Sequence, residues 1–338
     1  MIVTWYCTVS GGGVIDLRSW RMGIDAAAKR IDGRVLKTET KPAEPLSKRF
    51  GVPIFLKLEN RQSTGSFKLR GATNATALLG EAERARGLVT ASSGNHGRAL
   101  AHAAGALGVR CTVFLSPHVP QYKRDALAAL GAEVVIAGRS QDEAEDQARA
   151  TAKTEGRRFV PPFDDEGVIA GQGTIGDEIL DRVPEAELVV IPLSGGGLAA
   201  GVAAALKERR PGIRVIGASM ARGAAMHASL AAGHPVEIEE LPTLADALAG
   251  GLGRANRFTF EMVRDLLDDT VLVSEDEIAA GIRAAAAVGE VAEGGGAVGL
   301  AALIAGKLRL DGPTVFLLSG GNIDPVLHRK IVAGETPA

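Results

Sequence analysis

Short apolar runs rich in β-branched residues alternate with longer alanine-rich stretches along nearly the whole chain. The alanine-rich stretches predict helices, for example at 96–108, 120–131 and 198–210, and two of them reach a glycine stop signal at Gly108 and Gly131. This alternation is typical of βαβ units, so we expect an α/β fold with mostly parallel sheets covered by helices. The apolar runs predict nine strands, at residues 53–59, 87–92, 111–116, 132–138, 158–163, 187–194, 214–219, 270–274 and 314–321.

The number of strands also predicts how the chain is divided. Nine strands exceed what one mononucleotide-type unit needs, and 338 residues suffice for two domains. We therefore expect two lobes, each with its own sheet. The polar run 140–158 is predicted to be a solvent-exposed helix. Residues 1–21 hold both tryptophans and three consecutive glycines, and we interpret them as a loosely ordered N-terminal extension.

Charge and composition narrow the class of protein. The chain has 38 basic and 40 acidic residues, a net charge of −2, which argues against nucleic acid or an anionic membrane surface as a partner. Cys7 and Cys111 fit neither a disulfide framework nor a metal-ligand cluster. No apolar run approaches the roughly 18 residues of a membrane helix, and the N-terminus lacks the pattern of a signal peptide. We expect a cytoplasmic protein that acts on a small molecule.

Four strand ends run into turns rich in glycine or small residues, at 92–97, 194–201, 293–299 and 319–322. Backbone N–H groups in such turns can hold a phosphate, and a helix that follows adds its dipole. Ligands of doubly wound sheets lie at the carboxyl ends of strands. The turn at 194–201 follows a strong strand and opens a strong helix, so it is the best candidate for a phosphate site.

Other cofactor and catalytic sites have weaker support. Gly195, Gly197 and Ala200 match a dinucleotide fingerprint, but the acidic residue expected about 20 positions later is missing, which disfavours an NAD-binding oxidoreductase. A P-loop and a G-x-S-x-G elbow are absent from the sequence, and the six histidines lack the spacing of a metal site.

One lysine lies among residues of small size. In "QSTGSFKLRGA", residues 62–72, Lys68 follows Phe67 and is preceded by small or polar residues. A lysine that approaches another molecule closely needs such a setting, whereas a surface lysine does not. A phosphate site without a nucleotide fingerprint, together with this lysine, indicates pyridoxal phosphate, whose aldehyde needs an amine and whose phosphate needs a cradle.

The same segments resemble the fold-type II pyridoxal-phosphate enzymes, the family of threonine and serine dehydratases and serine racemase. The resemblance is carried by "KLENRQSTGSFKLRGA", "SSGNHGRALA", "VIAGQGTIGDEI", "SGGGLAAG" and "LLSGGN", in the same order from about residue 25 to 325. It implies a fold like that of tryptophan synthase β and a homodimer. It also implies a large cofactor-binding domain of residues 22–86 and 162–338 and a small mobile domain of residues 87–161.

The resemblance further implies roles for single residues. Lys68 would hold the cofactor as a Schiff base and then act as a base at the substrate's α carbon, with Phe67 packed beside the cofactor. Asn95 would bind the phenolic oxygen and Ser319 the ring nitrogen. Glu293 would either line the cofactor or merely cap a helix.

Two further sets of residues would bind the ends of the ligands. The backbone N–H groups that would hold the phosphate are those of Gly195, Gly196, Gly197 and Leu198. Ser92 could instead cap the helix that starts near His96. The residues that would receive the substrate carboxylate are Ser92, Ser93, Gly94, Asn95 and His96.

These roles predict a reaction. A serine at the ring nitrogen leaves that nitrogen largely unprotonated, which weakens the ring as an electron sink. Negative charge at the α carbon should then expel a β-leaving group, so the expected reaction is loss of water from a β-hydroxy amino acid, with release of a keto acid and ammonia. Ser93 lies where racemases place a second acid/base but also occurs in dehydratases, so an amino-acid racemase stays open.

The sequence departs from the family at several positions. Ser219 and Ala225 stand where these enzymes often carry the carboxylates of a divalent-cation site, so no metal is expected there. Ala245-Asp246-Ala247 replaces the family's usual Ala-Asp-Gly. Residues 161–176 and 217–253 look most like the dehydratase subgroup associated with hydroxyectoine utilisation.

This resemblance implies a substrate class. Intact hydroxyectoine has no free primary α-amine, so the substrate would be a ring-opened compound of the 3-hydroxy-2,4-diaminobutyrate type. A threonine or serine dehydratase of general catabolism is the alternative.

Overall fold

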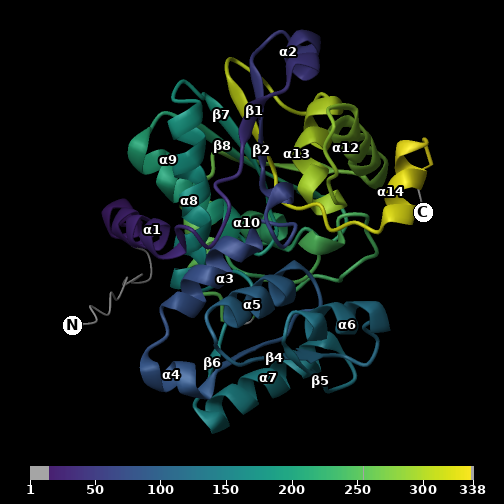
Figure 1. Cartoon of the computed structure of the whole chain (residues 1–338). Coiled ribbons are helices and arrows are strands. Elements are labelled where there is room, and N and C mark those ends of the chain that lie inside the picture. The colour runs from purple at the N-terminus through teal and green to yellow at the C-terminus, as the bar shows by residue number, and fades with distance from the viewer. Residues whose placement is uncertain (1–14, 254, 336–338) are drawn as a thin grey trace.

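The structure is a computed structural model and describes residues 15–253 and 255–335. Within these residues the strands form two sheets, one of six and one of four strands. Each sheet organises one lobe, and the two lobes are stacked one above the other in Figure 1. The α/β class and the two lobes predicted from the sequence are confirmed.

The larger sheet is parallel except at one edge. Its strands lie in the order β1-β2-β10-β7-β8-β9, and only β1 runs antiparallel to its neighbour. Both faces are buried, because successive residues such as Val189 and Val190 enter different apolar clusters. The strands are β1 (Thr40–Pro42), β2 (Ile54–Leu58), β7 (Leu188–Pro192), β8 (Arg214–Met220), β9 (Asp269–Val273) and β10 (Thr314–Leu318).

Helices cover both faces of this sheet (Figure 1). Those packed on one face are α1 (Leu17–Ile31), α8 (Glu166–Arg182), α9 (Gly197–Arg209), α10 (Ala225–Ala232) and α11 (Thr259–Leu266). Those on the other face are α2 (Glu44–Phe50), the 3-10 turn η2 (Asp246–Leu248), α12 (Glu275–Ala287), α13 (Gly294–Ile304) and α14 (Pro325–Val332). The 3-10 turn η1 (Glu59–Arg61) follows β2.

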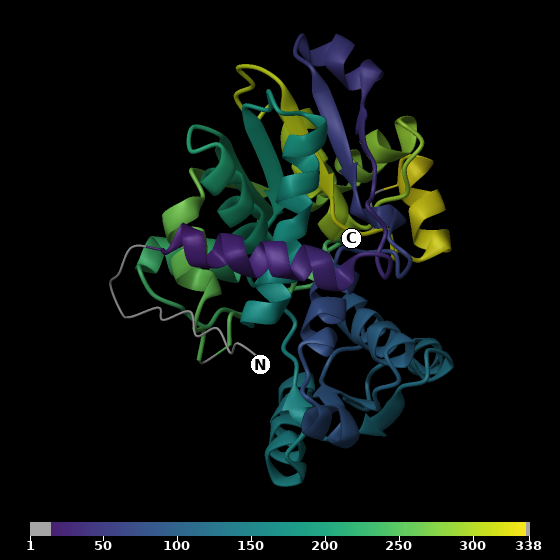
Figure 2. The same cartoon turned by 60° about the vertical axis from the view of Figure 1, so that its left-hand side comes forward.

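The smaller sheet is fully parallel, in the order β5-β4-β3-β6. Its strands are β3 (Leu88–Thr90), β4 (Cys111–Leu115), β5 (Glu133–Ile136) and β6 (Arg158–Phe159). Its helices are α3 (Lys68–Ala77), α4 (Glu81–Arg86), α5 (Asn95–Ala106), α6 (Gln121–Ala129) and α7 (Gln141–Glu155). Figure 2 shows this lobe below α1, which crosses the large lobe.

The packing of α3 bears on the expected domain limits. Leu69, Ala72 and Ala75 of α3 share an apolar cluster with Leu88 and Val113 of the smaller sheet. The first helix after the loop that holds Lys68 therefore packs with the small lobe, ahead of the expected limit at residue 87. The limits themselves, and the mobility of the small lobe, stay predictions.

Three expectations about secondary structure need correction. The strand predicted at 158–163 ends at Phe159, because Pro161 and Pro162 have no N–H to donate to a ladder. The short edge strand β1 was not predicted. The extension predicted for residues 1–21 is wrong for its last part, since α1 begins at Leu17 and buries Trp20 to 3% exposure. Residues 1–14, including Cys7, lie outside the described residues.

The turn at 293–299 does not follow a strand as expected, because it comes after α12. Other expectations about secondary structure hold. The other predicted strands are present, the polar run 140–158 forms the largely exposed helix α7, and Gly108 and Gly131 take positive φ values at helix ends.

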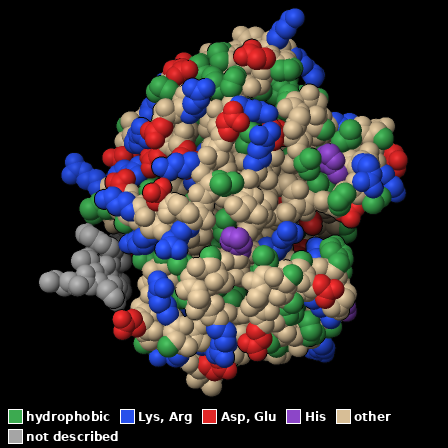
Figure 3. Space-filling model, in the orientation of Figure 1, with side chains coloured by type: hydrophobic (Ala, Val, Ile, Leu, Met, Phe, Trp, Pro, Cys, Tyr) green, Lys and Arg blue, Asp and Glu red, His purple; other side chains and the backbone are tan. Residues whose placement is uncertain are grey.

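Cys111 is a buried free thiol. Figure 3 shows acidic and basic side chains interspersed over one face of the molecule. Across residues 15–253 and 255–335, the helices lack the length and apolar character that crossing a membrane requires.

Candidate active site

Lys68 stands at the carboxyl end of β10. It is the first residue of α3, and the loop before it is fixed to the end of β10: the Phe67 N–H donates to the Ser319 carbonyl at 3.0 Å, and Ser66 forms a β-bridge with Gly320. The Lys68 ammonium lies 5.1 Å from the centre of the Phe67 ring and donates to the Pro162 carbonyl at 2.6 Å. The lysine predicted from its small-residue setting is thus held where ligands of parallel sheets bind.

The surroundings of Lys68 favour a neutral amine. Burial lowers the pKa of Lys68 to about 8, and the nearby Glu293 carboxyl opposes this shift. A lysine whose pKa is near 8 has a much larger neutral fraction at physiological pH than an ordinary lysine. Only the neutral amine can act as a nucleophile or a base.

The glycine loop between β7 and α9 forms a cradle of backbone N–H groups. Gly196 is the helix N-cap, with φ +91°. The first N–H groups of a helix have no acceptor within the helix, and the helix dipole favours an anion there. A Cβ at Gly195 would lie 2.4 Å from the Phe163 ring, so only glycine fits against this side chain. The loop has the geometry of a phosphate site.

Residues 162 and 163 connect the lysine to this cradle. Pro162 accepts the hydrogen bond from Lys68, and the next residue, Phe163, packs on Gly195 and Gly197. The Lys68 amine therefore contacts Pro162, and the glycine loop contacts the next residue, Phe163. This arrangement fits a ligand that carries both an aldehyde and a phosphate.

Replacing Gly195 with alanine should weaken cofactor binding. The added Cβ overlaps the Phe163 ring, and overpacking of this kind costs about 1–3 kcal/mol, or roughly 5- to 100-fold in affinity. Titration of cofactor-free protein with pyridoxal phosphate, followed by visible absorbance, measures the dissociation constant. Gly212→Ala is the control, because no atom lies within 4 Å of a Cβ there. Equal dissociation constants for the two variants would contradict the assignment of the cradle.

Asn95 meets two other loops. It is the first residue of α5, its amide nitrogen donates to the Glu293 carboxyl at 2.7 Å, and its amide oxygen accepts from Asn322 at 2.6 Å. Ser319, at the end of β10, is 4% exposed. Asn95, Glu293 and Lys68 thus come from three separate segments, as the sequence predicts for one site.

His96 is a buried neutral imidazole beside this group. It is 3% exposed, its Nε2 atom lies 3.0 Å from the Val160 carbonyl oxygen, and its Nδ1 atom has no partner. Burial, followed by the charge of Lys68, lowers the pKa of His96 to about 3. An unpartnered ring nitrogen in a buried position is available to a bound ligand.

Neither Ser92 nor Glu293 caps a helix with its side chain. Gly94 is the N-cap of α5, without a side-chain cap, so Ser92 does not cap this helix. Glu293 is the N-cap residue of α13, but its side chain makes no capping hydrogen bond and accepts from Asn95 instead. Ser92 and Ser93 are half-buried and Gly94 is exposed in the loop before Asn95. Their roles toward substrate stay predictions.

The pKa of the Glu293 carboxyl is unusually high. Burial raises its pKa to about 7, the hydrogen bond from Asn95 opposes this, and the negative charge of Asp246 raises the pKa further. Asp246 belongs to the segment that departs from the family pattern, and this segment covers the Glu293 loop, since a Cβ at Gly294 would lie 2.0 Å from the Leu244 carbonyl oxygen.

Replacing Glu293 with glutamine should flatten the pH dependence of stability. Between pH 4.5, its ordinary pKa, and about 7, the folded protein retains a proton on Glu293 that the unfolded chain has released. The free energy of unfolding therefore falls as pH rises through this interval, by up to about 3 kcal/mol, and the variant should lose that part of the slope. Urea unfolding of cofactor-free protein at several pH values measures it.

Glu290→Gln provides the control for this measurement. Burial would raise the pKa of Glu290, but hydrogen bonds from Lys41, Asn60 and Arg61 outweigh it and lower the pKa. The ionised Glu290 carboxylate stabilises the folded protein, and this contribution is lost only as pH falls below 4.5. Replacing Glu290 should therefore leave the pH dependence of the unfolding free energy above pH 5 unchanged. The idea fails if both variants keep the slope of the unmutated protein.

Some residues of the site were not singled out by the sequence. Phe163 lies in a segment predicted as a strand, and the proline pair before it was the signal that the strand ends there. The Asp164 carboxylate accepts from the N–H groups of Arg257, Phe258 and Thr259 at 2.6, 2.9 and 3.0 Å, which fixes the start of α11 beside the glycine loop. Asn322 ends the motif "SGGN", which was noticed only for its serine and glycines.

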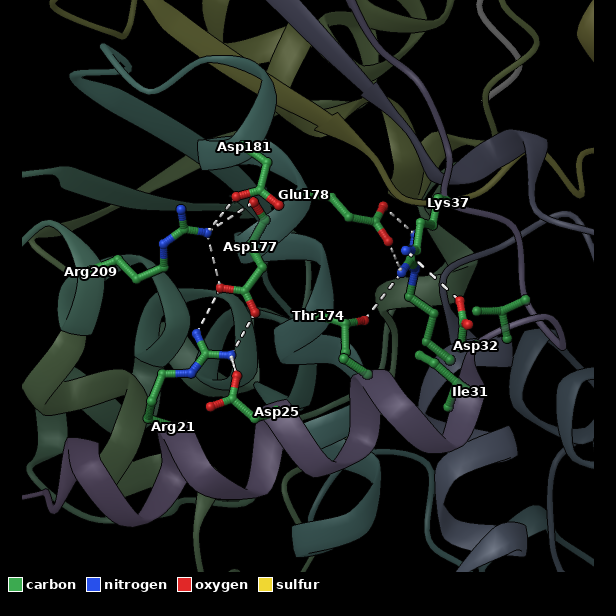
Figure 4. Close-up of a pocket in the computed structure, with 13 residues that line it drawn as sticks. Arg21, Asp25, Ile31, Asp32, Lys37, Thr174, Asp177, Glu178, Asp181 and Arg209 are labelled. Atoms are coloured by element: carbon green, nitrogen blue, oxygen red, sulfur yellow. Dashed lines mark hydrogen bonds and ion pairs between the residues drawn. The ribbon is translucent and has the colours of Figure 1, made fainter.

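A pocket of about 460 Å³ is lined mainly by residues of α1 and α8, and Lys68 is not part of its lining (Figure 4). Arg70 forms part of its wall and is fully buried, and its guanidinium donates to Glu59, Glu178, Thr174 and the Leu36 carbonyl. Lys57, also fully buried, pairs with Glu178. Because Arg70 has used its donors within the protein, this pocket offers structural ion pairs and lacks the reactive groups of the Lys68 site.

The two positions that correspond to the family's cation-site carboxylates, Ser219 and Ala225, are both buried. Ser219 is buried, with its hydroxyl at 3.5 Å from the Met220 sulfur, and Ala225 opens α10. In the part of the chain that the structure describes, three or more His, Cys, Asp or Glu side chains do not gather in a group that could hold a metal ion.

Comparison with known proteins adds independent information. A family model described as "Pyridoxal-phosphate dependent enzyme" matches residues 31–320. A Sinorhizobium fredii protein named "Putative threonine dehydratase" is 51% identical over 317 residues, which are 93% of this chain and 96% of that protein.

Two solved structures are similar in fold. The processed form of threonine deaminase isoform 2 from Solanum lycopersicum has a TM-score of 0.87 and 36% identity, with 96% of this chain and 89% of that chain covered. Maize serine racemase has a TM-score of 0.86 and 30% identity, with 91% of this chain and 95% of that chain covered.

Proposed function

Since this chain belongs to the pyridoxal-phosphate dependent enzymes and is a threonine dehydratase-like ammonia-lyase within them, we propose that it removes water from a β-hydroxy amino acid at the Lys68 site. The observation that carries the proposal is the pairing of an amine of lowered pKa with a phosphate cradle across residues 162–163. The enzyme uses pyridoxal phosphate as its cofactor.

The residues of the site fit this cofactor. The cradle at Gly195, Gly196 and Gly197 is open only because glycine occupies these positions, and the donors around it are neutral N–H groups. The buried His96 Nδ1 and Ser66 Oγ atoms lack partners within the protein, which marks room for polar groups of a ligand. Pyridoxal phosphate, when bound, supplies a conjugated ring that stabilises negative charge at the substrate's α carbon.

The protein's own groups would perform the proton transfers. Lys68 would remove the α proton as a neutral amine, and its low pKa keeps it ready for that step. Asn95 and Ser319 would bind the cofactor's oxygen and ring nitrogen, while Ser92, Ser93 and His96 would hold the substrate carboxylate. The β-hydroxyl leaves as water, and the resulting enamine tautomerises to an imine that water hydrolyses to ammonia and a 2-oxo acid.

The finer proposal concerns the substrate. We infer that it is a ring-opened compound of the 3-hydroxy-2,4-diaminobutyrate type from hydroxyectoine degradation. Support comes from the resemblance of residues 161–176 and 217–253 to that subgroup. Asp246, whose negative charge raises the pKa of Glu293, would also attract the second ammonium group of such a compound.

A substrate panel tests the proposal. Purified, cofactor-loaded enzyme is incubated with threonine, serine, 3-hydroxyaspartate and 3-hydroxy-2,4-diaminobutyrate, and release of ammonia and 2-oxo acid is measured. Turnover of the diamino compound alone supports the hydroxyectoine pathway. Brisk turnover of threonine or serine makes the enzyme a general catabolic dehydratase, which the names of its relatives favour. No turnover of any panel member overturns the dehydratase proposal.

A second candidate is an amino-acid racemase on the same residues. It is favoured by the similarity to maize serine racemase and by the position of Ser93 on the substrate loop. Chiral analysis of the recovered amino acid in the same incubations separates the two activities. Inversion of serine without loss of ammonia would establish the racemase, and Ser93→Ala should then remove it.

A further inference from the structure

The side chain of Asn322 joins three segments that are far apart in sequence. Its amide nitrogen donates to the Thr64 carbonyl at 2.9 Å and to the Asn95 amide oxygen at 2.6 Å. Thr64 belongs to the loop before Lys68, Asn95 opens α5 of the small lobe, and Asn322 follows β10 of the large lobe. One amide group thus uses both its hydrogens to connect the lysine loop with the asparagine loop.

The space around Asn322 confines its amide. Gly65 has φ +77°, and a Cβ at that position would lie 2.4 Å from the Asn322 amide oxygen. The backbone N–H of Asn322 is hydrogen-bonded to the Glu293 carboxyl. The side chain is therefore held against the loop on one side, and its backbone is held by Glu293.

These contacts determine which way the Asn95 amide points. An asparagine amide has one accepting and one donating end, and its orientation follows from its partners. With Asn322 as donor on one side and Glu293 as acceptor on the other, only one orientation satisfies both ends. The Asn95 oxygen is then occupied, and its NH2 group keeps one hydrogen beyond the hydrogen bond to Glu293.

We infer that Asn322 is a positioning residue that orients the Asn95 amide, so that its remaining N–H faces the cofactor oxygen. This inference rests on the proposed role of Asn95 in the site. Without Asn322, the Asn95 amide can turn over whenever Glu293 is protonated, because a carboxylic acid can donate to the amide oxygen. Asn322 removes that second orientation. Lys68, Asp246 and Arg98 are the charged groups that act on Glu293.

Asn322→Ala, Asn322→Asp and the control Asn60→Ala test the inference. Asn60 also donates two hydrogen bonds from one amide nitrogen across loops, to Glu290 at 3.1 Å and to the Val291 carbonyl at 3.0 Å, but it does not touch Asn95. The aspartate keeps the size of Asn322 and loses both donors. The measurements are Tm, the visible absorbance of the substrate-free holoenzyme between about pH 6 and 8, and kcat and KM on the best panel substrate.

We expect all three variants to lose some Tm. Only the two Asn322 variants should show a shifted absorbance maximum that changes with pH as Glu293 titrates, and a kcat lowered by about tenfold or more. If Asn322→Ala and Asn60→Ala differ from the unmutated enzyme in Tm alone, the inference is overturned and Asn322 is a structural residue. Asn95→Ala is measured in parallel: if this variant keeps the normal absorbance and kcat, the proposed role of Asn95 fails as well.

Discussion

Replacing Lys68 with alanine should lower turnover by roughly 10³-fold or more, while the fold stays intact. The Lys68 amine has a pKa lowered to about 8 and donates to the Pro162 carbonyl, next to the Phe163 side chain that packs on the glycine loop. Loss of a positioned base costs about 10²- to 10⁴-fold, and loss of a nucleophile costs more. Ammonia release on the best panel substrate measures the effect, and the visible absorbance of the cofactor should revert to that of the free aldehyde.

Two controls define this experiment. Lys68→Arg retains the charge but cannot act as an amine nucleophile near neutral pH, so it should be as inactive as the alanine variant. Lys207→Ala removes a lysine that pairs with Asp268 at 2.7 Å in the last turn of α9, at the other end of that helix from the glycine loop, and it should keep normal turnover. Retention of more than about a tenth of the activity in Lys68→Ala would exclude Lys68 as the reactive amine.

Arg70→Met should destabilise the protein by about 3–5 kcal/mol. Arg70 pairs with Glu59 at 2.8 Å and with Glu178 at 2.7 Å, and the side chains of Arg70 and Glu59 are at most 1% exposed. Methionine fills a similar volume but leaves the buried Glu59 charge with the Thr38 hydroxyl and with Lys57, at 4.0 Å. Removing one partner of a buried pair costs far more than the pair contributes net, because the other charge stays desolvated.

Urea unfolding at fixed protein and cofactor concentration measures this loss. Arg209→Met is the matched control: Arg209 bridges Asp177 and Asp181 at the rim of the pocket in Figure 4, its side chain is 36% exposed, and its loss should cost less than about 1 kcal/mol. Adding Glu59→Gln to Arg70→Met should recover part of the loss. Equal effects of the two arginine variants would contradict the account of the buried network.

Most of the fold could be predicted because buried parallel strands leave a strong pattern. Apolar runs such as 187–194 and 314–321 are typical of parallel strands in a sheet that is covered on both faces. The edge strand β1 could not be predicted, since three residues with mixed burial carry no period. The burial of Trp20 was missed for a different reason. Residues 1–21 were treated as one segment because of their unusual composition, although the helix α1 begins inside this segment, at Leu17.

The residues of the site also fall into a group that the sequence predicts and a group that it does not. Lys68, the glycine loop and Asn95 lie in local motifs, so the sequence alone predicts them. Asn322, Phe163 and Asp164 act through contacts with segments far along the chain, and a single sequence contains no record of such contacts. The ion network around Arg70 has the same character, because Glu59 and Glu178 meet only when β2, α3 and α8 pack together.

The hydrogen bond between Asn322 and Thr64 also has a consequence for the order of biosynthesis. These residues are 258 positions apart, and a ribosome that adds about 5–20 residues per second needs roughly 10–50 s to travel from one to the other. During that interval β2 has its hairpin partner β1 but lacks β10, and the Phe67 N–H lacks the Ser319 carbonyl. The lysine loop cannot take its final shape during that interval. Capture of the cofactor is therefore a late event, which follows the synthesis of residue 322.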